Sequence, residues 1–214
     1  MGTQQLNILI ADDHEVVRRG LQLILSDEFD PLVVGEASNT TETLAAARQG
    51  RWDIILLDIN MPVRGGLEIL PELRSIAPTT PVLMLSVFPE RDYAIRAFKL
   101  GAAGYLTKQT ASEELLLGIR KALSGGKYVS STLAEKLVQN LSGGTPVAPH
   151  ERLSNRELQV LRMITTGKTM KEIAADMCLS DKTVSTYRAR IAQKMKMGTN
   201  VELTRYAIEH HLVE

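Results

Sequence analysis

The stretch DIILLDINMP, residues 53–62, decides the fold class of this 214-residue chain. Its apolar residues 54–57 run without the polar alternation of a half-exposed strand, and Asp58 follows them. Strands of parallel sheets that are buried on both faces have this composition. Similar runs recur in the first half of the chain, at 6–11, 32–37, 81–86 and 103–106. We therefore expect five strands, of which 53–58 is the third.

A segment with helical periodicity follows each run, and the expected helices span about 14–27, 40–49, 65–77, 90–100 and 111–124. Strands that alternate with helices predict an α/β domain, here a doubly wound five-stranded parallel sheet with helices on both faces. Glycine pairs and prolines then interrupt the pattern, which indicates a linker with a short helix over 132–141. Beyond the linker the expected elements are all helical, at 155–166, 169–177, 181–195 and 200–210. The expected divisions are an α/β domain at 1–124, a linker at 125–150 and a small all-α domain at 151–214.

Composition narrows the class of protein. Hydrophobic residues make up 44% of the chain and charged residues 23%, as in ordinary soluble globular proteins. Residues 1–149 carry 17 acidic and 14 basic side chains, whereas residues 150–214 carry 8 and 11, a weak sign of a nucleic-acid partner for the second part. The single cysteine, Cys178, excludes an intrachain disulfide. Because no apolar stretch approaches the roughly 20 residues that span a bilayer, we expect a cytoplasmic protein with no membrane segment.

Polar side chains follow the ends of several expected strands. Asp12 and Asp13 follow the first, Asp58 ends the third, Ser86 ends the fourth, and Lys108 lies just past the fifth. The carboxyl ends of parallel strands share one edge of the sheet, where such folds bind their ligands. Three carboxylates that meet there repel one another unless a cation neutralises them, and hard oxygen ligands suit Mg²⁺. A carboxylate beside Mg²⁺ can accept a phosphoryl group, which an ammonium and a hydroxyl then stabilise.

This arrangement resembles the receiver domain of two-component response regulators, which has a flavodoxin-like fold. The motifs that carry the resemblance are ILIADDH (8–14), ILLDINMP (55–62), LMLSV (83–87) and GAAGYLTK (101–108). The resemblance implies that Asp58 is the phosphoacceptor and that a histidine kinase is the phosphodonor. It implies a magnesium site formed by Asp12, Asp13, Asp58 and the backbone carbonyl of Asn60. It also implies phosphate-binding and switch roles for Ser86, Tyr105 and Lys108.

Two residues depart from the receiver pattern. Gln109 follows the lysine where many receivers have proline, and Ser86 replaces the commoner threonine but keeps the hydroxyl. Phe88, close to the expected phosphate site, predicts slow self-dephosphorylation because a bulky apolar group hinders attack by water. The four histidines show no metal-ligand spacing, and His14 is expected at the start of a helix.

The second domain contains a helix-turn-helix pattern. A short turn at 178–180 joins two expected helices, and the helix at 181–195 has an exposed basic face with hydroxyl groups. Such a face offers contacts both to phosphates and to base edges of DNA.

The segment 153–203 resembles the LuxR-type helix-turn-helix of NarL/FixJ regulators, through LSNRELQVL, GKTMKEIA, LSDKTVSTYRARI and GTNVEL. The resemblance makes 181–195 the recognition helix. The implied base-facing residues are Ser185, Thr186, Ala189 and, as a further candidate, Arg188. The implied phosphate or rim contacts are Lys182, Thr183, Tyr187, Arg190 and Lys194. The implied dimerisation helix contains Val201, Leu203 and Tyr206, for which packing inside the domain is an equal alternative.

Together these patterns predict a transcription regulator rather than an enzyme: Asp58 accepts a phosphoryl group, and a homodimer then binds double-stranded DNA. Three alternatives stay open. They are a phosphohydrolase that turns over through Asp58, a regulator that binds DNA without phosphorylation, and a receiver whose helical domain binds protein or RNA.

Overall fold

The computed structural model describes residues 5–62, 64–87, 90–110, 112–130, 133–134, 148–210 and 212–213. The chain divides into two compact units, Met1–Ser142 and Gly143–Glu214, which are described separately. Phe88 and most of the helix expected at 132–141 lie outside the described residues. Among the helices described, none has the length and apolar character that would let it cross a membrane.

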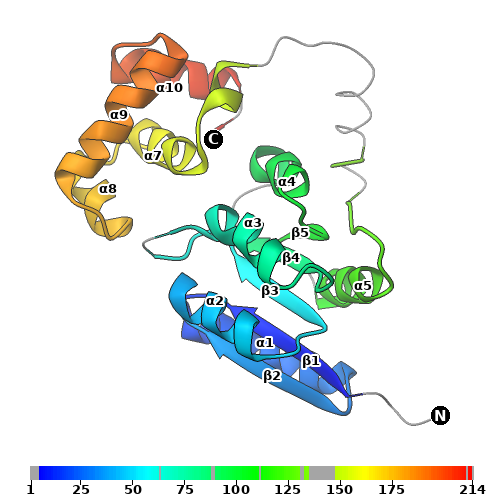
Figure 1. The fold of residues 1–214 in the computed structure, drawn as a ribbon. Helices are drawn as coiled ribbons and strands as arrows, with labels where there is room; N and C mark the ends of the chain where they lie inside the picture. Colours follow the sequence, from blue (N-terminus) through cyan, green and yellow to red (C-terminus); the bar gives the residue numbers. More distant parts are fainter. Residues whose placement is uncertain are drawn as a thin grey trace. The chain divides into compact units, whose positions relative to one another are not determined.

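The first unit alternates strands and helices (Figure 1). Its strands are β1 (Leu6–Ala11), β2 (Leu32–Ala37), β3 (Ile54–Asp58), β4 (Val82–Ser86) and β5 (Gly104–Thr107). Its helices are α1 (Glu15–Glu28), α2 (Thr40–Gln49), α3 (Gly66–Ile76), α4 (Glu90–Lys99) and α5 (Ser112–Leu123). The strands pair in parallel in the order β2-β1-β3-β4-β5. The predicted five-stranded parallel sheet is confirmed, and the helix ends fall within a residue or so of the expected ones.

Burial explains why these strands are continuous apolar runs. Every residue of β3 and β4 is buried, as expected for strands that are covered on both faces. On one face, Ile8, Ile54 and Leu83 of the sheet form a core with residues of α1 and α5. The strand order turns at β1, with β2 on one side and β3 on the other. In an open sheet such a switch point leaves a crevice at the carboxyl ends of the strands.

The start of the expected linker packs against the first unit. Tyr128 forms a parallel bridge with Gly104 of β5, and its backbone N–H donates to the Ala103 carbonyl at 2.8 Å. Both Tyr128 and Leu133 are buried. The glycine pair 125–126 marks the end of α5, but the residues that follow it still pack against the core of the first unit.

The second unit is helical in its described residues, with a 3₁₀ turn, η1 (Pro149–Arg152), that the sequence did not predict. Four helices follow: α7 (Asn155–Thr165), α8 (Met170–Asp176), α9 (Asp181–Met195) and α10 (Asn200–Glu209). Ser154, Thr169 and Thr199 begin α7, α8 and α10 with capping boxes, in which hydroxyl and glutamate side chains satisfy exposed backbone N–H groups. The helices enclose a small apolar core formed by Leu158, Leu161, Ile173, Val184, Ile191 and Leu203.

Candidate functional site

The side chains expected in the pocket of the first unit lie at the carboxyl edge of the sheet. The pairing of Ala11 with Leu57 brings Asp12, which follows β1, level with Asp58 at the end of β3. Ser86 ends β4 and pairs with Thr107, the residue before Lys108. Asp12, Asp58 and Ser86 are completely buried, although each is polar. Such groups have no packing use at these positions, so their burial points to chemistry.

Lys108 joins the two buried carboxylates. Its Nζ lies 2.6 Å from Asp12 Oδ2 and 3.0 Å from Asp58 Oδ2. The ammonium therefore lies inside the acidic cluster and partly neutralises it, at one oxygen of each carboxylate. The sequence placed Lys108 near a phosphate, but it gave no reason to expect these ion pairs.

Burial dominates the electrostatics of Asp58. Removal from water raises the pKa of Asp58 from 3.8 to about 6, against the attraction of Lys108, while the charge of Asp12 adds to the rise. Burial alone would lower the pKa of Lys108, but the nearby Asp58 and Asp12 carboxylates outweigh that effect and raise it. The pocket thus holds a protonated lysine beside a carboxylate that is poorly stabilised in its charged form.

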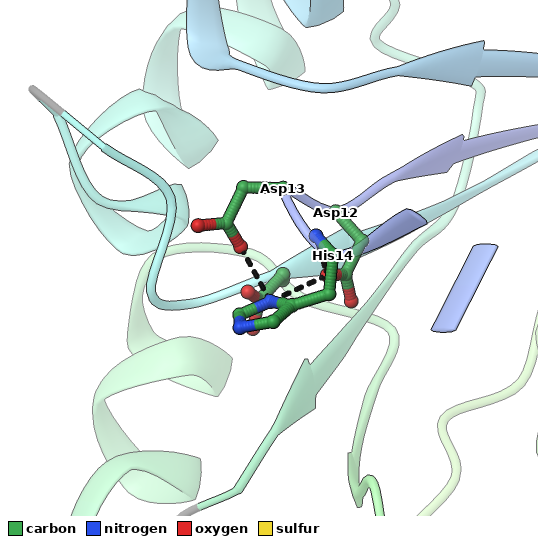
Figure 2. Close-up of side chains that lie close together, drawn as sticks. Asp12, Asp13 and His14 are labelled. Carbon is green, nitrogen blue, oxygen red and sulfur yellow. Dashed lines mark hydrogen bonds and ion pairs between the residues drawn. The ribbon is translucent and has the colours of Figure 1, made fainter. Parts of the chain in front are cut away.

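His14 is the member of this pocket that sequence reasoning missed as a possible ligand. Its Nδ1 lies 2.7 Å from Asp13 Oδ1 and 3.2 Å from Asp12 Oδ1. Figure 2 marks both contacts with dashed lines. One ligand atom from each of Asp12, Asp13, His14 and Asp58 lies within 4.8 Å of the others, a spacing that fits a single metal ion. His14 does precede α1, as expected, but its ring turns toward the acidic cluster. The only sequence signal was its position directly after the aspartate pair.

Two neighbours fix the loops that carry the carboxylates. The Arg18 guanidinium donates to the backbone carbonyl of Asp12 at 2.8 Å and pairs with Glu36 of β2 at 2.7 Å. Gly66, the first residue of α3, lies so close to β3 that an added Cβ would meet the Asp58 carbonyl oxygen at 2.0 Å. Glycine is therefore needed where the helix passes the end of the strand.

The remaining pocket candidates are also located. Asn60 lies just beyond β3, half-buried, and the backbone N–H of Ile59 donates to the Leu85 carbonyl, which ties this loop to β4. Tyr105 is fully buried in β5, where it pairs with Met84. Its ring therefore lies inside the unit in this structure.

The basic helix of the second unit begins after the turn that sequence reasoning placed at 178–180. Ser180 caps α9 by accepting a hydrogen bond from the Thr183 N–H, and Cys178 adopts a positive φ of 53° in the turn. The side chains expected to face DNA are exposed or partly exposed: Lys182, Thr183, Ser185, Thr186, Tyr187, Arg188, Ala189 and Arg190. A polar depression on this surface is lined by Ser180, Lys182, Thr183, Thr186, Tyr187 and Arg190.

Two of the basic candidates also make contacts within the unit. Lys194 Nζ lies 2.6 Å from Glu157 Oε2, and Glu157 is buried in α7. Burial would raise the pKa of Glu157, but the hydrogen bonds from Lys194 and Ser154 lower it below its ordinary value. Arg188 donates to the Gly198 carbonyl at 2.7 Å and to Asn200 Oδ1 at 2.9 Å, which fixes the turn before α10.

The dimerisation candidates differ in exposure. Val201 is 78% exposed, whereas Leu203 is fully buried in the core of the unit. Tyr206 is also buried: its hydroxyl lies 2.8 Å from His150 Nδ1, and its ring stacks on His210. Leu203 and Tyr206 therefore support the fold of this unit, and they can influence a partner surface only through the exposed residues of α10.

Comparisons with known proteins agree with this geometry. Residues 8–120 match the response regulator receiver domain, and residues 151–207 match the bacterial regulatory proteins of the luxR family. This chain is a member of the response regulator family. It is 38% identical over 208 residues to the response regulator UvrY of Escherichia coli (strain K12), covering 97% of this chain and 95% of UvrY. It is 36% identical over 209 residues to the response regulator GacA of Pseudomonas protegens, covering 98% of each.

Solved structures agree with the fold of this response regulator. A LuxR-family two-component response regulator from Aurantimonas sp. SI85-9A1 is 27% identical, with a TM-score of 0.59, and the match covers 65% of this chain and all of that one. RcsB from Salmonella enterica serovar Typhimurium, bound to promoter rprA in the presence of the phosphomimetic BeF3-, is 23% identical with a TM-score of 0.62. That match covers 95% of this chain and 98% of RcsB, and at this identity it supports the fold alone.

The predicted class of function is therefore confirmed. The chain is a phosphorylation-controlled regulator of transcription that combines a receiver domain with a luxR-type DNA-binding domain, and its family is not one of enzymes. Receiver domains bind a divalent cation at an acidic site, and this chain has such an acidic cluster.

Proposed function

We propose that Asp58 is the residue of this response regulator that is phosphorylated, and that a histidine kinase supplies the phosphoryl group. The single observation that carries the proposal is the buried Asp58 carboxylate, ion-paired to Lys108 at 3.0 Å at the carboxyl edge of the sheet. An oxygen of Asp58 attacks phosphorus, the bond from phosphorus to the kinase imidazole breaks, and the imidazole leaves with the electron pair.

The chain's own residues provide the other roles. In the proposed site Asp12, Asp13, Asp58 and the backbone carbonyl of Asn60 hold Mg²⁺, which neutralises charge on the transferring group when it is bound. The Lys108 ammonium is already beside Asp58, so it can follow the new phosphoryl oxygens over a short distance. Ser86 donates its hydroxyl to the same oxygens. Tyr105, next to these strand ends, responds to the movement of Ser86.

A phosphodonor experiment tests this assignment. With ³²P-labelled phosphohistidine of a kinase or with labelled acetyl phosphate, and with Mg²⁺, the wild-type chain takes up one stable label. Asp58→Asn takes up none, while the exposed Asp27→Asn control is labelled normally. Label retained by Asp58→Asn contradicts the assignment. Rapid multiple turnover of a small phosphate ester favours the phosphohydrolase alternative instead.

We further propose that α9 enters the major groove of double-stranded DNA. The polar depression at its start brings Lys182 and Arg190 together with hydroxyl groups, a set that fits a backbone phosphate. Ser185, Thr186 and Ala189 lie exposed on the helix and face the bases, with Arg188 beside them. Thr183, Tyr187 and Lys194 complete the rim. We propose that the protein acts in the cytoplasm, which is consistent with a DNA partner.

Salt dependence separates these contacts. Each phosphate contact adds about one to the slope of log affinity against log salt, so Lys182→Gln and Arg190→Gln each reduce that slope by about 1. Lys121→Gln, in the exposed part of α5, leaves the slope unchanged. Selection of DNA from a random pool, with and without phosphodonor, identifies the sequence and the effect of phosphorylation. A DNA affinity that does not change with the phosphodonor favours a regulator that binds DNA without phosphorylation. Binding of RNA or protein instead of DNA favours a receiver whose helical domain has another partner.

We also propose that the phosphorylated protein forms a homodimer through α10, which carries the exposed Val201 and Ile208 beside an apolar groove. If α10 forms the dimer interface, a charged side chain at position 201 should abolish the dimer in sedimentation experiments. A dimer that forms unchanged contradicts the proposal. The proposed domain boundaries are 1–124 for the receiver, 125–150 for the linker and 151–214 for the DNA-binding domain, with the start of the linker, around Tyr128, packed against the receiver.

A further inference from the structure

An arginine side chain of α9 holds the turn that leads into α10. Arg188 Nε donates to Asn200 Oδ1 at 2.9 Å, and Arg188 Nη2 donates to the Gly198 carbonyl at 2.7 Å. Asn200 is the first residue of α10, so the guanidinium joins the two helices across the turn between them. Because a guanidinium is planar and its donors point in fixed directions, two hydrogen bonds from it restrain the orientation of this turn.

The position of Arg188 on α9 explains why it reaches this turn. Val184 and Ile191 are buried in the core of the unit. Arg188 follows Val184 by four residues and precedes Ile191 by three, the spacing of neighbours on one helix face. Arg188 is accordingly half-buried, whereas Ser185 and Ala189 are exposed. It therefore lies at the border between the face that packs into the unit and the face that is proposed to meet DNA.

Asn200 connects this contact to the surface proposed for dimerisation. Asn200, Val201 and Ile208 line the same apolar groove on α10. A change in the contact between Arg188 and Asn200 therefore acts directly on a wall of that groove.

The helix α10 has its own means of starting, which do not involve Arg188. Thr199 and Glu202 form its capping box, and the Gly198 N–H also donates to Glu202 Oε2 at 2.9 Å. Leu203, which is fully buried, anchors the helix in the core of the unit. Arg188 therefore sets the orientation of the turn before α10 rather than the formation of the helix.

We infer that Arg188 is a positioning residue that couples DNA binding by α9 to dimerisation through α10. This inference rests on the proposed function, for which it names a link between the two surfaces. Two of the five N–H groups of the guanidinium donate to the turn, and the others can meet DNA at the same time. DNA that holds Arg188 also orders the turn and the start of α10, and the dimer favours DNA binding by the same factor in return.

Duplexes with one half-site and with two half-sites test this coupling. They are taken from the DNA that the full chain selects from a random pool in the presence of a phosphodonor. The ratio of the two-half-site affinity to the one-half-site affinity measures the coupling. Arg188→Met should lower this ratio by about tenfold, within the usual range for coupled sites. The matched control Arg190→Met, in the exposed part of α9, should lower both affinities and leave the ratio unchanged.

Variants of Asn200 identify the contact itself. Asn200→Ala removes the acceptor and should also lower the ratio, but it should add little to Arg188→Met, because the two side chains form one contact. Asn200→Asp keeps an acceptor oxygen at the same place and should keep the ratio. Circular dichroism should show the helical signal of the wild type in all these variants.

Three results overturn the inference: a ratio that Arg188→Met leaves unchanged, fully additive effects of Arg188→Met and Asn200→Ala, or a loss of helical signal in Arg188→Met, which would make the arginine a structural residue only. The wild type provides the test of the proposed dimer. If it binds both duplexes with the same affinity and forms no dimer in sedimentation experiments, the proposed dimer through α10 falls, and the inference falls with it.

Discussion

Replacement of Asp58 by asparagine is expected to make the receiver more stable in the absence of divalent cations. Asparagine has nearly the shape of a protonated aspartate but carries no charge. Since burial raises the Asp58 pKa from 3.8 to about 6, the charged form is disfavoured in the fold by about 3 kcal/mol. The variant gains up to about that amount above pH 6.

The sign of the pH dependence follows from the direction of the shift. Between pH 3.8 and about 6 the folded protein retains a proton on Asp58 that the unfolded chain has lost. The contribution of Asp58 to the stability of the wild type is therefore fully present at low pH and is lost as the pH rises through about 6. The difference between variant and wild type should be close to zero near pH 4, grow up to about pH 6 and then stay constant.

Trp52, the only tryptophan of the chain, provides the assay. Its indole N–H donates to the Ala46 carbonyl at 2.9 Å within the first unit, so its fluorescence reports the unfolding of that unit. Urea titrations in the presence of a chelator, from pH 4 to 8, compare wild type, Asp58→Asn and the exposed control Asp27→Asn. A difference that is independent of pH, or a variant that is less stable at pH 7.5, refutes the reasoning. Added Mg²⁺ should stabilise the wild type and have little effect on Asp58→Asn.

Three further changes probe other parts of the structure. Lys108→Ala leaves two buried carboxylates without their ammonium, so the free energy of unfolding should fall by about 3 to 5 kcal/mol in the same fluorescence assay. Mg²⁺ should restore part of this loss. A variant that keeps full stability without Mg²⁺ contradicts the prediction. Gly66→Ala should destabilise the receiver by about 1 to 3 kcal/mol and reduce labelling of Asp58, because the new Cβ overlaps a backbone oxygen. The control Gly20→Ala has open space around it and should be neutral or stabilising. Glu157 has a lowered pKa in the fold, so its contribution to the stability of the helical unit is present above pH 4.5 and is lost as the pH falls below that value. Glu157→Gln should remove this sensitivity to acid, which hydrogen exchange of α7 peptides measures.

The sheet and its polar edge were predictable because a simple rule links them to the sequence. Strands buried on both faces are continuous apolar runs, and parallel strands place their carboxyl ends at one edge. A polar residue at the end of a central strand therefore reaches the pocket whatever conformation the loops adopt, as Asp58 and Ser86 illustrate. The contact between Lys108 and Asp12 was not predictable in the same way, since the direction of a long side chain depends on the charges around it.

The helical unit shows a second limit of sequence reasoning. Helical periodicity identifies which face of α9 is apolar, but it does not identify the partners of the polar residues. Arg188 and Lys194, which stay proposed DNA contacts, also contact the turn before α10 and the buried Glu157, and periodicity did not predict these contacts. Leu203 lies on an apolar face that packs inside the unit. The sequence of α10 alone does not decide whether such a face packs inside the unit or against a second copy of the chain.

The charges of the pocket connect the metal to the phosphoryl group. With the ionised Asp12, Asp13 and Asp58, the single ammonium of Lys108 leaves two negative charges, which repel an incoming phosphoryl donor. A divalent ion removes that repulsion, so a cation should bind before transfer. If Asp58 is the phosphorylated residue, as proposed, phosphorylation adds negative charge there, which draws Lys108 away from Asp12 and leaves that carboxylate to the cation alone. Phosphorylation and cation binding should therefore strengthen each other, and the phosphorylated protein should hold its ion more tightly than the unmodified one.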